Sequence, residues 1–224
     1  MPEKTRTTDT ASTTREHWNA YYAQDDAPMK PSSFARYCLP LADRSLPLLD
    51  AGCGNGRDLL YFAAQGIDVI GVDLSETGVT RLRERIPSAV ASRVGLHVGD
   101  VTNLPEDGFR RRFGTVYSRF VLHAFVEEGE RRFLRWAAAH AADGGRLMIE
   151  ARSVLGSLYG LGEPCGRDAF IHGHYRRFIR RSELEERIRE VGFVIEESVE
   201  ADGLTVCGKD DPVVIRVVAR KPGA

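Results

Sequence analysis

The chain has 224 residues, and its 31 lysines and arginines nearly balance 32 aspartates and glutamates, for a formal net charge of −1. This balance argues against a protein whose main task is to grip nucleic acid, because that task needs excess Lys and Arg. No apolar run reaches the roughly 18 residues of a membrane-spanning helix, and the N-terminal segment MPEKTRTTDTASTTRE lacks the apolar stretch of a secretory signal. We therefore expect a cytoplasmic protein, and we expect free thiols at its cysteines, which form no C-x-x-C pair: Cys38, Cys53, Cys165 and Cys207.

The N-terminal part combines a polar tail with two expected helices. Residues 1–12 are rich in threonine and are expected to be disordered. Thr13 and Glu16 have the spacing of a capping box, which predicts a helix over residues 14–23, and a second helix is expected from Ser32. Three aromatic residues of the first helix fit either a core position or a lid over a bound ligand: Trp18, Tyr21 and Tyr22.

From residue 46 onward, short apolar runs alternate with helical patterns. The runs predict buried strands at 46–50, 68–72, 94–98, 114–117, 146–151, 193–199 and 213–219. Helices are expected between them at 56–65, 75–85, 127–142 and 182–192, the last opened by a capping box at Ser182.

This alternation predicts an α/β fold with a doubly wound, mostly parallel sheet of seven strands. No helix separates the last two strands, so they should form a hairpin whose final strand is antiparallel to the rest. We expect one domain over residues 13–224, with N-terminal lid helices at 13–43. Residues 153–181 fit no expected element, and an insert this long is commonly functional.

A glycine-rich loop follows the first expected strand. Asp50 is followed by Gly52, Gly54 and Gly56, where the first strand gives way to a helix. Glycine allows a sharp turn and the close approach of a ligand, and a helix start offers unpaired N–H groups. In an open α/β sheet, ligands bind beyond the carboxyl ends of the strands, so this loop predicts a binding site.

Two more acids stand at strand ends, Asp73 after the second strand and Asp100 after the third. Each acid alone could simply cap a turn, but three acids beside the glycines predict one acid-lined crevice. Asp50 would repel the pyrophosphate of a dinucleotide, whereas a ligand with a cationic amino acid end tolerates it. This disfavours a nicotinamide-dependent oxidoreductase.

The spacing of Asp50, Gly52, Gly54 and Gly56, with Asp73 and Asp100, resembles that of class I S-adenosylmethionine-dependent methyltransferases, over about residues 45–220. The resemblance implies S-adenosyl-L-methionine as cofactor, leaving as S-adenosyl-L-homocysteine. It places the methionine part at Asp50 and the glycines, the ribose at Asp73 and the adenine at Asp100. The cofactor-binding residues it implies are Asp50, Gly52, Gly54, Gly56, Asp73, Leu74, Asp100, Val101 and Ser118.

The composition of the insert indicates the chemical class of the methyl acceptor. Residues 163–181 hold five arginines and two histidines against two acids, and arginine binds oxyanions through a bidentate fork. The insert therefore favours a small phosphate, phosphonate or carboxylate, unless these arginines are solvated or pair with acids of the next helix. The expected substrate-binding residues are Lys30, Arg167, His172, His174, Tyr175 and Arg176.

Methyl transfer mostly requires that donor and acceptor are aligned, and sometimes that a proton is removed. His123 could be a general base or a structural imidazole. The segment Ser118-Arg119-Phe120-Val121 differs from the tetrapeptides of family members that methylate bases, which disfavours nucleic acid. No metal is expected, because His123, His172 and His174 lack a supporting acid or cysteine. The expected catalytic residues are His123, Arg119 and Tyr22.

The chain also resembles small methyltransferases of natural-product pathways, including antibiotic biosynthesis and phosphonate methylation, at three segments: Pro31–Ala35, Ser118–His123 and Gly173–Phe178. We therefore expect O-methylation of a small anionic metabolite by a monomer or homodimer. One alternative is O- or N-methylation of a sugar or an aromatic metabolite, with His123 as base. Another is a non-catalytic protein that binds S-adenosylmethionine.

Overall fold

The computed structural model describes residues 6–24, 28–105, 109, 112–206 and 210–223. The first half contains α1 (Arg6–Ala23), α2 (Ser33–Cys38), the 3-10 turn η1 (Leu39–Leu41), β1 (Leu48–Ala51), α3 (Arg57–Ala64), β2 (Val69–Asp73), α4 (Glu76–Arg85), η2 (Ser88–Arg93) and β3 (Val94–Val98). The second half contains β4 (Phe113–Arg119), η3 (Leu122–Ala124), α5 (Glu127–His140), β5 (Ala141–Arg152), β6 (Glu163–Gly166), β7 (Ala169–His172), β8 (His174–Arg177), α6 (Arg181–Glu190), β9 (Val194–Ala201) and β10 (Val214–Arg220).

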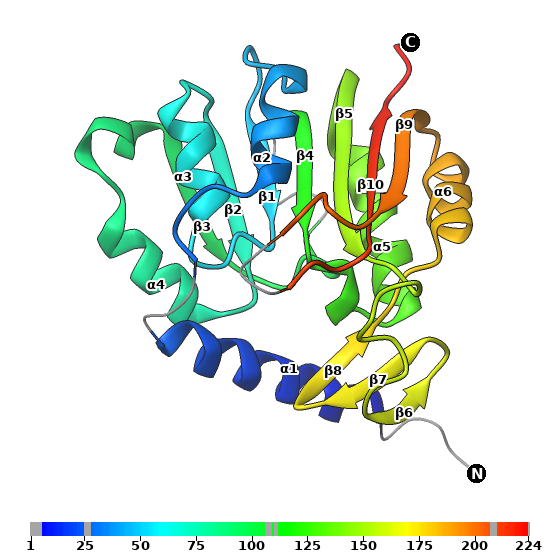
Figure 1. Cartoon of the computed structure of the whole chain (residues 1–224). Coiled ribbons are helices and arrows are strands. Elements are labelled where there is room, and N and C mark those ends of the chain that lie inside the picture. The colour runs from blue at the N-terminus through cyan, green and yellow to red at the C-terminus, as the bar shows by residue number, and fades with distance from the viewer. Residues whose placement is uncertain (1–5, 25–27, 106–108, 110–111, 207–209, 224) are drawn as a thin grey trace.

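The main sheet has seven strands in the order β3-β2-β1-β4-β5-β10-β9 (Figure 1). Strand β1 pairs in parallel with β2 and β4, whereas β10 is antiparallel to both β5 and β9. The predicted fold, including the terminal hairpin, is confirmed. Because the chain winds outward from β1 to β3 and then returns to β4, the strand order reverses between β1 and β4, which is where such sheets bind ligands.

Apolar side chains cover both faces of the sheet. On one face α5 and α6 bury Phe133, Leu134 and Ile188, and on the other α2 and α3 bury Phe34 and Phe62. The sheet is thus covered by helices on both sides, as the alternating pattern predicts. Within the part of the chain that the structure describes, no helix is long and apolar enough to cross a membrane. The buried Cys38 and Cys53 are free thiols, and Cys207 lies outside the described residues.

The N-terminal helix is longer than its sequence predicts. It begins at Arg6, whereas the sequence predicts a start at residue 14 after a capping box at Thr13; residues 1–5 lie outside the described residues. Extending an existing helix by a turn is easier than starting one, so the docked aromatic part can carry a polar extension. In Figure 1, α1 runs along the edge of the sheet where β1 and β2 end.

The insert forms its own small antiparallel sheet, in the order β6-β7-β8 (Figure 1). A bridge from Ser153 to Ile179 ties it to the end of β5. The sequence does not reveal these strands, because each has only four residues, too few to show a clear periodic pattern. The capping box at Ser182 is also wrong: Arg180 precedes α6, and its carbonyl accepts the Leu184 N–H at 3.0 Å.

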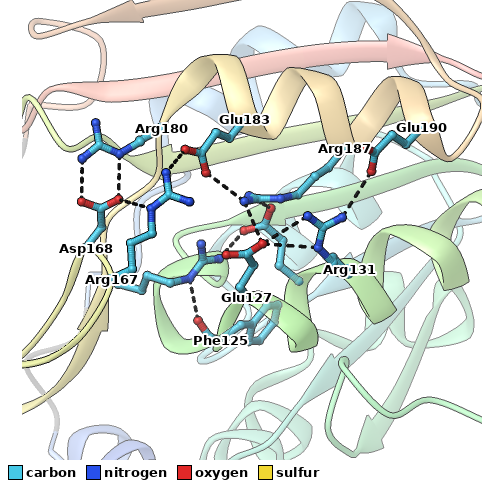
Figure 2. A network of polar contacts seen from close by, with 11 residues as sticks. Phe125, Glu127, Arg131, Arg167, Asp168, Arg180, Glu183, Arg187 and Glu190 are labelled. Atoms are coloured by element: carbon cyan, nitrogen blue, oxygen red, sulfur yellow. Dashed lines mark hydrogen bonds and ion pairs between the residues drawn. The ribbon is translucent and has the colours of Figure 1, made fainter.

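A network of ion pairs fastens the insert to the helices, and Figure 2 shows it. Arg177 of β8 binds the buried Glu130 of α5, and its Nε donates to the carbonyl of Phe125 at 2.9 Å. Arg187 of α6 donates to the other oxygen of Glu130, also at 2.9 Å. One buried carboxylate therefore joins β8, α5 and α6.

Candidate active site

The loop between β1 and α3 requires glycine for two reasons. Gly52, Gly54 and Gly56 have φ values of 83°, 53° and 78°, in the left-handed region that other residues rarely adopt. A Cβ atom on each would also lie closer than 3.0 Å to a side chain, namely those of Val121, Tyr22 and Leu82 respectively. The loop thus forms a tight turn with no room for side chains.

The first two predicted acids lie beside this loop. Asp50 is only 3% exposed, and burial, followed by the charges of Asp58 and Asp73, raises its pKa well above the usual value. Asp73 accepts hydrogen bonds from the N–H groups of Gly54 and Ser75, both at 2.8 Å. Burial raises the pKa of Asp73, and these backbone bonds oppose the rise.

The third acid lies in the turn after β3. Oδ1 of Asp100 accepts from the backbone N–H and the hydroxyl of Thr102, both at 2.8 Å, which fixes the carboxylate in place. All three acids line one cavity of about 640 Å³ at the reversal point between β1 and β4. The predicted cofactor residues that line it are Asp50, Gly52, Asp73, Leu74, Asp100 and Val101.

The other three predicted cofactor residues are not part of this lining. Gly54 and Gly56 shape the loop without lining the cavity. Ser118 is fully buried in β4, and its hydroxyl has no hydrogen-bond partner among the described residues.

A fourth acid, Asp58 of α3, also lines the cavity, and the sequence reasoning missed it. It accepts hydrogen bonds from the backbone N–H and hydroxyl of Ser32 and from the Tyr117 hydroxyl, each at 2.7 Å. The Ser32 hydroxyl in turn caps α2 by accepting from Ala35 N–H at 2.9 Å. Asp58 therefore fixes the start of α2 against the glycine loop.

Helix α1 closes one side of the cavity. Asn19 Oδ1 accepts from the hydroxyl of Ser75 at 2.8 Å, and Arg81 Nη1 donates to the Tyr22 carbonyl at 3.0 Å, which holds the helix on α4. Its aromatic residues line the cavity and belong to neither core cluster, which favours the lid interpretation: Trp18, Tyr21 and Tyr22. Burial, followed by the charge of Asp73, raises the pKa of Tyr22 well above its usual value, so this hydroxyl stays protonated.

Three arginines line the end of the cavity nearest the insert sheet. Arg119 Nε donates to Glu150 at 2.8 Å, and Arg152 Nη2 donates to Asp210 at 2.9 Å. Arg176 differs, because its Nη2 donates to Nε2 of His174 at 3.1 Å and its buried Nε has no hydrogen-bond partner in the described part of the chain. Of these three, only Arg119 and Arg176 were predicted.

Two histidines of this end are uncharged. His123 is 5% exposed, and burial, followed by the charges of Arg152 and Arg176, lowers its pKa well below the usual value. Burial and Arg176 lower the pKa of His174 to about 4. Protonation of both rings is therefore disfavoured at neutral pH, and Nδ1 of His123 has no hydrogen-bond partner within the described residues.

Phe120, which the sequence reasoning also missed as a site residue, lines the cavity between two of these arginines. Its ring centre lies 4.3 Å from the Arg119 guanidinium carbon and 5.0 Å from that of Arg152. Its φ of 55° is unusual for a bulky residue, and such backbone strain concentrates at functional sites. No sequence signal indicates this conformation.

Four predicted substrate residues lie away from the cavity. Arg167 has a side chain that is 66% exposed and pairs with Glu183 (Figure 2), while Lys30 and His172 are exposed. Tyr175 is half-buried and also does not line the cavity, because neighbouring residues of a strand face opposite ways, and here His174 and Arg176 face inward. No group of side chains in the described residues could hold a metal ion.

The fold and this acid–glycine loop define an α/β cofactor-binding domain of the methyltransferase type. Residues 23–198 match the family described as methyltransferase domain, and the chain belongs to that family.

Individual proteins are similar to shorter parts of the chain. It is 36% identical to the magnesium-protoporphyrin O-methyltransferase of Rhodobacter capsulatus over 56 residues, which are 25% of each protein. It is 34% identical to the dTDP-3-amino-3,4,6-trideoxy-alpha-D-glucopyranose N,N-dimethyltransferase of Streptomyces venezuelae over 107 residues, 46% of this chain and 41% of the relative. The chain thus spans less than half the length of these curated relatives.

One solved structure of similar fold is the glycopeptide N-methyltransferase MtfA complexed with (S)-adenosyl-L-methionine. It covers 100% of both chains, with a TM-score of 0.68 and 20% sequence identity. At this identity the match concerns the fold.

The residues present fit S-adenosylmethionine. Gly52 lines the cavity and carries no side chain, so a ligand can approach its backbone closely. Burial disfavours the ionised forms of Asp50 and Asp73, and a ligand with a positively charged amino group would offset that effect. The carboxyl group of Asp73, held at the end of β2 by two backbone bonds, can accept from ligand hydroxyls.

Proposed function

We propose that this protein methylates an oxygen of a small anionic metabolite, a phosphonate, phosphate or carboxylate, with S-adenosylmethionine as the donor. Membership of the methyltransferase-domain family supports the methyl-transfer part of the proposal. The donor would lie against Asp50, the glycine loop, Asp73 and Asp100, while the acceptor would occupy the end of the cavity next to the insert.

The observation that carries the anionic acceptor is the unbalanced positive charge at that end. Arg119 and Arg216 both pair with the carboxylate of Glu150, and Arg152 forms an ion pair with Asp210. Arg176 has no ion pair in the described part of the chain, although it is partly buried. A charged guanidinium away from water is stabilised by an opposite charge, so this end of the cavity favours an anion.

When bound, S-adenosylmethionine supplies a methyl group activated by a positively charged sulfur. The residues of this chain then have to align the acceptor and exclude water. Arg119, Arg152 and Arg176 would orient the oxyanion, and α1 would cover the cavity with Tyr22 and Trp18. An ionised oxygen needs no base, so this reaction does not depend on His123.

A second candidate is methylation of a neutral hydroxyl or amine of a sugar or an aromatic metabolite. One observation favours it: His123 is buried and uncharged, and its Nδ1 has no hydrogen-bond partner among the described residues. Such a ring could take the proton of a hydroxyl acceptor. The two relatives described above act on different atoms, since one is named an O-methyltransferase and the other an N,N-dimethyltransferase.

One assay tests both candidates. Purified protein is incubated with S-adenosylmethionine and a panel of phosphonates, phosphates, hydroxy acids and neutral sugars, and release of S-adenosylhomocysteine is measured. For an anionic acceptor, we expect Arg176→Gln to raise KM by about 10- to 100-fold, because a hydrogen bond to a charged group is lost. His123→Gln should have a smaller effect, and Arg167→Gln, on the exposed surface, should have none.

The other outcomes are equally distinct. If the acceptor is a neutral hydroxyl, His123→Gln should lower kcat by ~10²–10⁴ and Arg176→Gln should matter little. Methylation confined to neutral amines or to macromolecules would refute the anionic acceptor. Binding of S-adenosylmethionine without turnover on any substrate would identify a non-catalytic binding protein.

A further inference from the structure

His17 of the lid helix contacts the insert sheet inside the cavity. Its ring stacks on that of His174, with ring centres 4.1 Å apart and an angle of 19° between the ring planes. His174 Nε2 accepts the hydrogen bond from Arg176, and all three side chains line the cavity. A continuous set of contacts therefore leads from the unbalanced arginine of β8 to α1, and Figure 1 shows these two elements side by side.

The protonation states of His17, His174 and Arg176 suit the binding of an anion. Because the Arg176 guanidinium can only donate, Nε2 of His174 carries no proton. Burial and the charge of Arg176 lower the pKa of both His17 and His174. An anion at Arg176 would oppose that charge and allow an imidazole N–H to donate a second hydrogen bond.

We propose that His17 is an acceptor-binding residue, which forms with His174 and Arg176 one anion subsite that is complete only when α1 is docked. The proposal rests on the anionic acceptor proposed above. It makes α1 part of the binding site as well as a cover. By linkage, bound anion and docked helix then stabilise each other by the same factor.

The chain offers a built-in reporter for this subsite. Trp18, the next residue on α1, has its ring centre 5.0 Å from that of His17 and 5.8 Å from that of His174. The sequence has two tryptophans, and the second, Trp136, is buried in α5, where it donates to the Pro105 carbonyl at 3.3 Å. Trp136→Phe therefore leaves Trp18 as the single fluorescent reporter of the lid.

The test measures binding of methylphosphonate and of inorganic phosphate in the presence of S-adenosylhomocysteine. Calorimetry gives the Kd, and Trp18 fluorescence in the Trp136→Phe background reports on α1. We expect His17→Ala to weaken anion binding by about 10-fold, because one hydrogen bond to a charged ligand is lost. His17→Gln keeps an N–H donor and should retain part of the affinity.

Arg15→Gln is the control on the same helix, because Arg15 is exposed and does not line the cavity. It should bind both probes as the parent does. Equal affinity of His17→Ala and the parent would overturn the inference and leave the proposed function intact. If the parent with S-adenosylhomocysteine bound neither probe, the inference would be overturned together with the phosphonate and phosphate acceptors of the proposed function. Equal losses of S-adenosylhomocysteine and anion binding in His17→Ala would indicate a general lid defect and would also overturn the specific assignment.

Discussion

Replacing Glu130 by glutamine should weaken the protein far more than a neighbouring substitution of the same kind. Glu130 is 0% exposed and binds two guanidiniums, those of Arg177 and Arg187. Removing one partner of a buried ion pair costs ~3–5 kcal/mol, since a buried charge is left uncompensated. Arg187 retains Glu127 and Glu183, at 3.2 and 2.9 Å, so Arg177 bears most of the loss.

We therefore expect the free energy of unfolding to fall by about 3 kcal/mol, the lower end of that range. For a chain of this length, such a loss lowers Tm by roughly 6–12 °C. Urea unfolding followed by circular dichroism gives the free energy, and a thermal melt gives the Tm.

Glu128→Gln provides the control on the same helix. Its side chain is 57% exposed and pairs with Arg135 at 3.0 Å, and exposed pairs contribute less than about 1 kcal/mol. If Glu130→Gln unfolded within 1 kcal/mol of the parent, or if both variants lost the same amount, the reasoning about the buried pair would be wrong.

Three further predictions concern the cavity. Gly54→Ala places a Cβ against Tyr22 at a φ of 53°, so S-adenosylhomocysteine binding measured by calorimetry should weaken at least ~10-fold; parental affinity would contradict the tight-turn argument. Asp73→Asn removes a charged acceptor and should weaken the same binding by ~10- to 100-fold, whereas an unchanged Kd would exclude Asp73 from the cofactor site. The pKa of His174 falls from its ordinary 6.5 to about 4 on folding, so the unfolded chain binds more protons between these values. The stability that neutral His174 contributes is thus complete above pH 6.5 and lost as the pH falls toward 4. His174→Gln should flatten this part of the curve of unfolding free energy against pH. An identical curve for the variant would refute the lowered pKa of His174.

The acid-lined end of the cavity could largely be predicted from the sequence. Asp50 and the three glycines are nearly contiguous, and Asp73 and Asp100 stand at the ends of recognisable apolar strands. Parallel strands bring their carboxyl ends to one edge, so linear spacing translates directly into proximity. Asp58 escaped notice because its partners, Ser32 and Tyr117, lie far away in the sequence.

The arginine-lined end of the cavity could be predicted only in part. A cluster of arginines in the sequence does not say which of them face inward, since that depends on the register of strands only four residues long. Arg176 and His174 face the cavity, whereas Arg167 pairs with Glu183 at the surface. Arg152 follows a strand that was predicted from its apolar residues. No sequence pattern marks this arginine as a residue of the cavity.

Strand β8 places two adjacent arginines in opposite settings, Arg176 toward the cavity and Arg177 toward Glu130. Inserting or deleting one residue in the hairpin at Gly173 would exchange these settings. Arg177 would then leave its buried pair with Glu130, and Arg176 would leave the cavity. Variation in the length of this hairpin should therefore occur in steps of two residues. Changes of acceptor during evolution would more readily arise by exchange of the side chains at positions 174 and 176.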